Sequence, residues 1–173
     1  SLDYTIKFDA STSGIKNATV TILSNDDNEG TYTFDIKAEA KWPEIEISGN
    51  NTEIEDGDNS PISTDHTHFG DVNVSSATQD RTFTISNIGN RTLNLTGSPL
   101  VTISGTNSAD FSILTQPSAN SIAVNGSKTF IVRFDPSVYG SRVAEISIAN
   151  DDDDENPYKF SIEGNGLAPE IKI

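Results

Sequence analysis

Apolar residues alternate with polar residues along much of the chain, and this period of two predicts β-strands. The alternation is clearest in segments at residues 4–8, 83–85, 130–134, 144–148 and 158–162. Successive side chains of a strand point to opposite faces, so each segment gathers its apolar residues on one buried face. Turns rich in Gly, Asn and Ser separate these segments, and no window of about 11 residues has a helical period. The pattern therefore predicts an all-β fold, an antiparallel β-sandwich.

The chain contains an internal repeat. Residues 1–47 align without a gap onto residues 127–173, at an offset of 126, and about 17 of these 47 pairs are identical. A period of about 126 residues suits one sandwich domain. We predict that residues 1–41 are the C-terminal strands of a preceding, partial repeat and that residues 42–168 form a complete repeat. Residues 169–173 are then the first strand of a following repeat, and the chain is an excised segment of a longer one.

The partial repeat at residues 1–41 is too small to bury a core by itself, because three strands expose most of their apolar face. Its partners are expected to be neighbouring repeats of the same chain. A second copy of the chain, giving a homodimer through the partial repeat, is the alternative. An exposed sheet edge could also pair with another protein.

The complete repeat resembles the Hydin-like (ASH-type) immunoglobulin-like repeats, in particular the bacterial form named for choice-of-anchor D proteins. The resemblance covers about three quarters of the chain in order. It rests on the motifs Thr82-Phe83-Thr84-Ile85-Ser86-Asn87-Ile88-Gly89, Ser108-Ala109-Asp110-Phe111, Gln116-Pro117, Gly126-Ser127-Lys128-Thr129-Phe130, Phe134-Asp135-Pro136-Ser137 and Asp154-Glu155-Asn156-Pro157-Tyr158.

This resemblance implies an immunoglobulin-like fold and no catalytic residues. It implies a structural or adhesive repeat of a large bacterial protein that is secreted or attached to the cell surface. Related eukaryotic modules are intracellular scaffolds, so a protein-docking role is an alternative. The large apolar residues expected to fill the space between the two sheets are Phe83, Phe111, Phe130, Phe134 and Phe160.

Composition narrows the possible partners. The chain has 173 residues, with 11 Lys and Arg against 26 Asp and Glu, a net charge of −15 and a pI near 4.2. Such a chain would be repelled by a nucleic acid or an anionic membrane surface, so neither is an expected partner. Membrane insertion is not expected either, because no apolar run approaches the roughly 20 residues of a membrane span. The chain has no Cys, which excludes disulfides and thiol chemistry.

An acidic run between two predicted strands is the strongest candidate for a ligand site. It consists of Asp151, Asp152, Asp153, Asp154 and Glu155, and in the partial repeat it recurs as a loop that contains Asp26, Asp27 and Glu29. Carboxylates crowded into one loop repel one another unless a cation offsets them, and Ca²⁺ prefers oxygen ligands. The run therefore predicts a Ca²⁺ site, and a solvated hairpin tip is the alternative.

Two further groups of residues could hold metal. Asp56 and Asp58 resemble the start of a calcium loop, although no Glu follows at the required distance. His66 and His68 have a spacing that a zinc or copper site can use, with Asp65 or Asp71 as a third ligand. The alternative for both groups is an exposed loop.

The sequence predicts no enzyme, because it contains no nucleophile elbow, no phosphate-binding glycine loop and no His at motif spacing from a nucleophile. Carbohydrate binding as an accessory module of a secreted enzyme is the main rival function. It would need an exposed aromatic platform, for which Trp42 is the candidate glycan contact.

Overall fold

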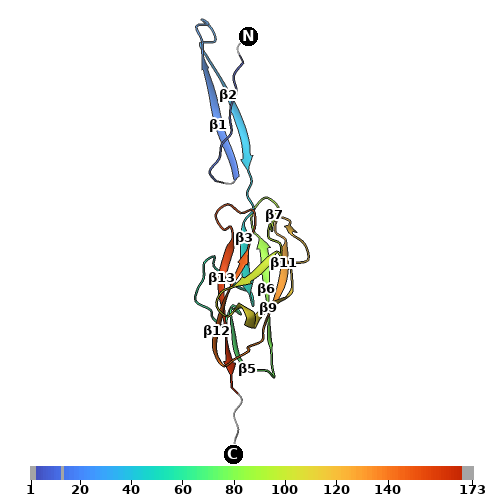
Figure 1. The fold of residues 1–173 in the computed structure, drawn as a ribbon. Helices are drawn as coiled ribbons and strands as arrows, with labels where there is room; N and C mark the ends of the chain where they lie inside the picture. Colours follow the sequence, from blue (N-terminus) through green and yellow to red (C-terminus); the bar gives the residue numbers. More distant parts are fainter. Residues whose placement is uncertain (1–2, 13, 169–173) are drawn as a thin grey trace, which may run out of the picture. The chain divides into compact units, whose positions relative to one another are not determined.

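The computed structural model describes residues 3–12 and 14–168, and its regular structure is almost entirely β (Figure 1). One short 3₁₀ turn, η1 (Ser108–Asp110), is the exception. The strands are β1 (Gly14–Leu23), β2 (Thr31–Ala40), β3 (Ile45–Gly49), β4 (Thr52–Ile54), β5 (His68–Asn73), β6 (Gln79–Asn87), β7 (Leu93–Asn94), β8 (Val101–Ser104), β9 (Phe111–Thr115), β10 (Ser121–Ile122), β11 (Ser127–Phe134), β12 (Gly140–Ile148) and β13 (Tyr158–Leu167). The predicted all-β class is confirmed.

The chain divides into two compact units, Ser1–Trp42 and Pro43–Ile173. The first unit contains one antiparallel hairpin, in which β1 pairs with β2 from Gly14↔Ala40 to Leu23↔Thr31. The predicted strand at residues 4–8 is wrong, because residues 3–10 have no strand structure and the side chains of Tyr4, Ile6 and Phe8 are exposed. An alternating pattern needs a neighbouring strand to complete its hydrogen bonds, and this segment has none among the described residues.

The second unit is a sandwich of two sheets. One has the strand order β4-β3-β6-β11-β9 and the other the order β5-β13-β12-β8, with a short β7–β10 ladder beside them. All neighbours are antiparallel except β5, which runs parallel to β13. The predicted immunoglobulin-like antiparallel sandwich is confirmed, with that one parallel edge as an addition.

Aromatic side chains fill the space between the sheets. The five phenylalanines that the sequence places in the core are all at most 6% exposed, and Phe69 on β5 joins them. Phe83 stacks on Phe130 with ring centroids 5.4 Å apart, and Phe111 stacks on Phe134 at 4.8 Å. Large buried rings of this kind supply much of the hydrophobic stabilisation of a sandwich.

The hairpin of the first unit repeats the register of the last hairpin of the second. Adding 126 to the pairs Gly14↔Ala40 and Ile22↔Tyr32 gives Gly140↔Gly166 and Ile148↔Tyr158, which are pairs of β12 with β13. The same offset relates the two segments in sequence. That residues 1–41 belong to a preceding repeat stays a prediction, and the predicted strand at 169–173 lies outside the described residues.

Candidate metal centre

The loop between β12 and β13, residues 149–157, is organised by the buried side chain of Asn150. Its Nδ2 donates hydrogen bonds to the carbonyl oxygens of Ile148 at 3.2 Å and Glu155 at 2.9 Å. Its Oδ1 accepts a hydrogen bond from the amide of Asp152 at 2.7 Å. Because Asn150 is only 1% exposed, these bonds fix the backbone at two positions of the acidic run.

Asp152 connects this loop to the start of β3. Its Oδ2 accepts a hydrogen bond from the amide of Ile45 at 2.9 Å, and the residue is 1% exposed. This bond brings Glu44, which directly precedes β3, beside the loop. The second oxygen of Asp152, Oδ1, is buried and has no hydrogen-bond partner.

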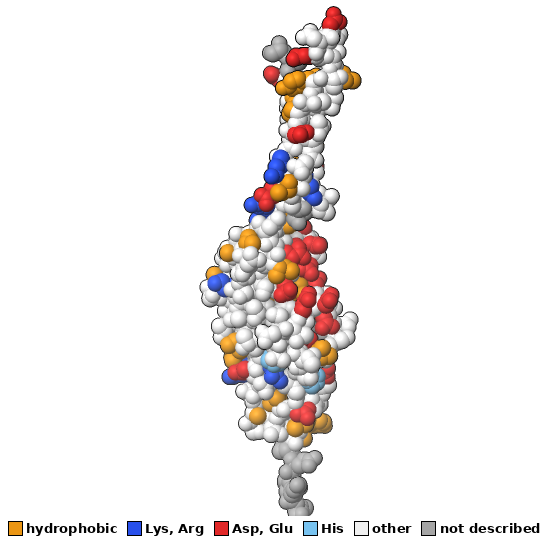
Figure 2. All heavy atoms as spheres, turned by 180° about the vertical axis from the view of Figure 1, so that it is seen from behind, with side chains coloured by type: hydrophobic (Ala, Val, Ile, Leu, Met, Phe, Trp, Pro, Cys, Tyr) orange, Lys and Arg blue, Asp and Glu red, His pale blue; other side chains and the backbone are white. Residues whose placement is uncertain are grey.

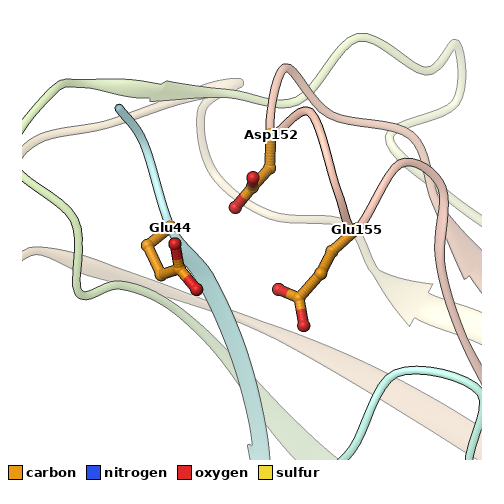
Figure 3. A group of neighbouring side chains, drawn as sticks. All are labelled: Glu44, Asp152 and Glu155. Atoms are coloured by element: carbon orange, nitrogen blue, oxygen red, sulfur yellow. The ribbon is translucent and has the colours of Figure 1, made fainter. Parts of the chain in front are cut away.

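Three carboxylates converge at this place. Glu44, Asp152 and Glu155 each offer an oxygen, and these oxygens lie within 4.8 Å of one another. Figure 3 shows the three side chains turned toward a common space, one from the chain entering β3 and two from the β12–β13 loop. The Oε2 atom of Glu155 is also buried without a partner. Glu44 is the exposed member, so the group is open to water on one side.

The electrostatics of the group are unfavourable for three ionised carboxylates. Burial, followed by the charges of Asp152, Glu44, Asp56 and Asp154, raises the pKa of Glu155 to about 7. Burial is also the largest cause of the raised pKa values of Asp152 and Glu44, and the charge of Asp154 adds to both. Figure 2 shows acidic side chains gathered on one face of the second unit. A cation or protons at this group would relieve the repulsion.

The other residues of the predicted acidic run are not among the three converging carboxylates, although the charge of Asp154 acts on all three. Asp151 is already satisfied, because its oxygens accept hydrogen bonds from the amide of Asn94 at 2.7 Å, from Asn94 Nδ2 at 2.9 Å and from Arg91 Nη2 at 3.1 Å. Burial alone would raise the pKa of Asp151, but these hydrogen bonds and the charge of Arg91 lower it. Asp153 and Asp154 are exposed on the loop.

The remaining predicted calcium ligands lie outside this group, and three of them accept hydrogen bonds from backbone amides. Asp56 accepts a hydrogen bond from the amide of Lys159 at 2.7 Å, and Asp58 accepts one from the amide of Ser60 at 2.9 Å. In the first unit, Asp26 accepts hydrogen bonds from the amides of Asn28 and Glu29, and Asp27 and Glu29 are exposed. None of these joins a convergent group of three ligands within the described ranges.

The two histidines do not form a joint site with a third ligand among the described residues. His66 lies in a turn with φ of 68°, whereas His68 begins β5 and its Nδ1 accepts a hydrogen bond from the Gly70 amide at 3.1 Å. Burial and the charge of Arg81 lower the pKa of His66. Trp42, the predicted glycan contact, is half-buried at the end of the first unit, and its role stays a prediction.

Sequence reasoning missed Glu44, although the internal repeat contains a signal for it. Pro43-Glu44-Ile45 recurs as Pro169-Glu170-Ile171, so Glu44, which precedes β3, has an identical counterpart in the sequence. Asp152 and Glu155 likewise match Asp26 and Glu29 at the same offset. The acidic positions shared by both copies include all three residues, together with Asp135 and Asp153.

No helix in the described part of the chain is long and apolar enough to cross a membrane.

A comparison with curated proteins finds no match to the chain. Among solved structures, a Porphyromonas gingivalis W83 protein of unknown function is 16% identical, with a TM-score of 0.50, over 90% of this chain and 67% of its own.

Two Vibrio cholerae proteins are similar over smaller parts of their length. The secreted serine protease VesC is 15% identical with a TM-score of 0.45, over 58% of this chain and 22% of its own. The VesB protease is 15% identical with a TM-score of 0.40, over 84% of this chain and 40% of its own.

The sequence model of the HYDIN/CFA65/VesB-like, Ig-like domain matches residues 62–165, which is more than half of the chain. The chain therefore belongs to the HYDIN/CFA65/VesB-like Ig-like domain family.

Proposed function

We propose that this chain is part of a tandem array of non-catalytic Ig-like modules in a large bacterial protein, secreted or attached to the cell surface, of the choice-of-anchor D kind. Each module spaces or displays other parts of that protein. The observation that carries this proposal is the β1–β2 hairpin, which has the register of β12–β13 at an offset of 126. A hairpin that copies the last hairpin of a complete module is the expected end of a preceding one.

The exposed apolar face of the hairpin supports this reading. Ile22 and Tyr32 are 37% and 56% exposed, whereas their counterparts Ile148 and Tyr158 are 0% and 2% exposed in the complete sandwich. The same alternation is therefore present in both hairpins, but one of them lacks an opposing sheet among the described residues. The remaining strands of its own module are the natural cover for such a face.

A fusion protein tests the proposal directly. Residues 43–126 of this chain, placed before residue 1, supply the strands that the repeat predicts for the preceding module. Ala38→Gly and Ala40→Gly are included because their counterparts Gly164 and Gly166 have no room for a Cβ, which would lie 2.3 Å from the Phe134 ring and from the Val138 carbonyl oxygen. We expect a second sandwich, and hence about twice the calorimetric enthalpy of unfolding of the unfused chain.

The matched control is Phe34→Asp, at the position equivalent to Phe160 of the core. In the fusion this change should abolish the added enthalpy, whereas in the unfused chain it should leave the unfolding of residues 43–168 unchanged. If the fusion and the unfused chain have the same enthalpy of unfolding, the hairpin is not the end of such a module.

A further inference from the structure

We propose that Glu44, Asp152 and Glu155 bind one Ca²⁺ ion, which joins the start of β3 to the β12–β13 loop. The ion would connect the first strand of the sandwich, β3, to its last hairpin, β12–β13. Residues near the beginning and near the end of the sandwich would therefore bind the same ion. This proposal concerns the second unit alone and does not depend on the tandem array.

The buried oxygen of Asp152 is the observation that points to a ligand. A carboxylate oxygen without a hydrogen-bond partner in a residue that is 1% exposed carries a desolvation cost that the protein itself does not offset. Figure 3 shows this carboxylate turned toward Glu44 and Glu155. In the described part of the chain, no ion pair joins Lys or Arg to any of the three residues. Arg91, which contacts the same loop, is paired with Asp151.

The chemistry of the donor set favours Ca²⁺ over other metals. All three ligands are carboxylate oxygens, which are hard donors, and no nitrogen or sulfur ligand belongs to the group. Ca²⁺ binds oxygens at about 2.4 Å, so oxygens on opposite sides of the ion lie about 4.8 Å apart. The oxygens of this group lie within 4.8 Å of one another. Mg²⁺ demands near-ideal octahedral geometry and usually keeps several waters, whereas Ca²⁺ accepts an irregular set of carboxylate ligands.

The open side of the group can complete the coordination. Ca²⁺ takes about 6–8 oxygens, more than three carboxylates offer even when some bind through both atoms. Glu44 is exposed, so water can reach the ion from that side. Three negative charges also exceed the charge of one Ca²⁺ ion, which keeps the site attractive to the cation while it reduces the mutual repulsion of the carboxylates.

The internal repeat provides independent support from the sequence. Each proposed ligand has an identical counterpart at an offset of 126: Glu44 matches Glu170, Asp152 matches Asp26 and Glu155 matches Glu29. By contrast, Asp151 and Asp154, which are outside the proposed ligand set, match Asn25 and Asn28. The three ligand positions therefore recur together; Asp153 also recurs, as Asp27, whereas Asp151 and Asp154 do not.

The test measures the Tm of the full chain in EDTA and in Ca²⁺, with Mg²⁺ at equal ionic strength as the control for charge screening. Ca²⁺ at about 100 times its Kd should raise the Tm by several degrees. Asp152→Asn and Glu155→Gln should lose this rise, whereas Asp153→Asn, an exposed neighbour with the same change of charge, should keep it. In EDTA, Glu155→Gln should melt above the wild type, because it removes one of the repelling charges.

Isothermal titration and amide NMR shifts detect Ca²⁺ binding on the wild-type chain directly. The test therefore does not depend on whether the variants fold. Titration of the wild-type chain with CaCl₂ should give one site in the second unit, with shifts at residues 44–45 and 150–156. The proposal is overturned if millimolar Ca²⁺ leaves both the Tm and these amides unchanged, if Mg²⁺ produces the same rise, or if the folded Glu155→Gln variant binds Ca²⁺ as the wild type does.

Discussion

Buried polar residues, rather than the exposed acidic ones, fix the loops of the sandwich. Asp110 is 2% exposed, and its two oxygens accept hydrogen bonds from Arg142 Nε at 2.7 Å and from the Ser137 amide at 2.8 Å. This carboxylate therefore joins η1, the β11–β12 connection and β12. This role explains why an Asp occupies the third position of the Ser108-Ala109-Asp110-Phe111 motif.

Asp110→Ala should lower the free energy of unfolding by about 3–5 kcal/mol at pH 7, because it leaves the Arg142 guanidinium without its buried partner. Burial alone would raise the pKa of Asp110, but the hydrogen bonds from Ser137 and Arg142 outweigh it and lower the pKa. A carboxyl with a lowered folded-state pKa stabilises the protein above its unfolded pKa, and this contribution disappears as the pH falls through the folded value.

The difference between wild type and Asp110→Ala should therefore shrink below about pH 4, which urea denaturation at pH 7 and pH 3 would measure. Asp80→Ala, which breaks the exposed ion pair with Arg133, is the control and should cost far less. A penalty at pH 3 as large as that at pH 7 would show that lost packing, and not the charge, is responsible.

Asn150→Ala tests whether this side chain organises the acidic loop. The change leaves two carbonyl groups and the Asp152 amide without their partner, at an expected cost of about 2–4 kcal/mol. Asn165→Ala, which removes one exposed hydrogen bond to Asp71, should cost no more than about 0.5 kcal/mol. Chemical denaturation of both variants makes the comparison, and equal effects would refute the special role of Asn150.

At the scale of elements, β13 makes a close contact in the core at a position where β2 has a different residue. Gly164 lies against the ring of Phe134, and an added Cβ would lie 2.3 Å from the ring. The equivalent position in β2 is Ala38. The first unit therefore cannot reproduce this contact in the same form, even though its strand register is the same.

Gly164→Ala should destabilise the second unit by about 1–3 kcal/mol, because the ring of Phe134 must move in a closely packed core. Glu163→Ala, on the opposite face of the same strand, should stay within about 0.5 kcal/mol of the wild type. Thermal unfolding of the two variants measures the difference. A neutral Gly164→Ala variant would show that the core has room that the structure does not indicate.

The sequence allowed prediction of the long strands, because their alternation is set by burial of one face. Residues 130–134, 144–148 and 158–162 form strands with buried alternate positions, as predicted. Residues 4–8 have the same pattern without strand structure, because a pattern does not supply a hydrogen-bonding neighbour. The two- and three-residue strands β4, β7 and β10 are too short to show a period.

The candidate site was predicted in part. Asp152 and Glu155 belong to the acidic run that predicts a Ca²⁺ site, but composition does not distinguish them from Asp151, which is paired with Arg91 and Asn94. Glu44 lies more than 100 residues away in the chain, and long-range hydrogen bonds place it there, among them the bond from the Ile45 amide to Asp152. The directions of the side chains and the long-range hydrogen bonds determine which carboxylates converge, and the sequence pattern does not predict these for single residues.

On the scale of the whole molecule, the two units differ in how completely each buries its apolar residues. The second unit has two opposed sheets and a continuous core, whereas the first has one hairpin with an exposed apolar face. A two-stranded hairpin in water is marginally stable. The stability of the chain should therefore reside in residues 43–168.

Amide hydrogen exchange of the full chain tests this account most directly. β1–β2 and β12–β13 have the same register, so a difference in protection comes from the flanking strands and the opposing sheet, which only β12–β13 has among the described residues. At low protein concentration, the account predicts slow exchange in β12–β13 and exchange at least a hundredfold faster in β1–β2. Protection that rises with concentration would indicate a second copy on the hairpin, as in the homodimer alternative. Equal protection of both hairpins at every dilution would contradict the account, because the first unit would then be stable on its own.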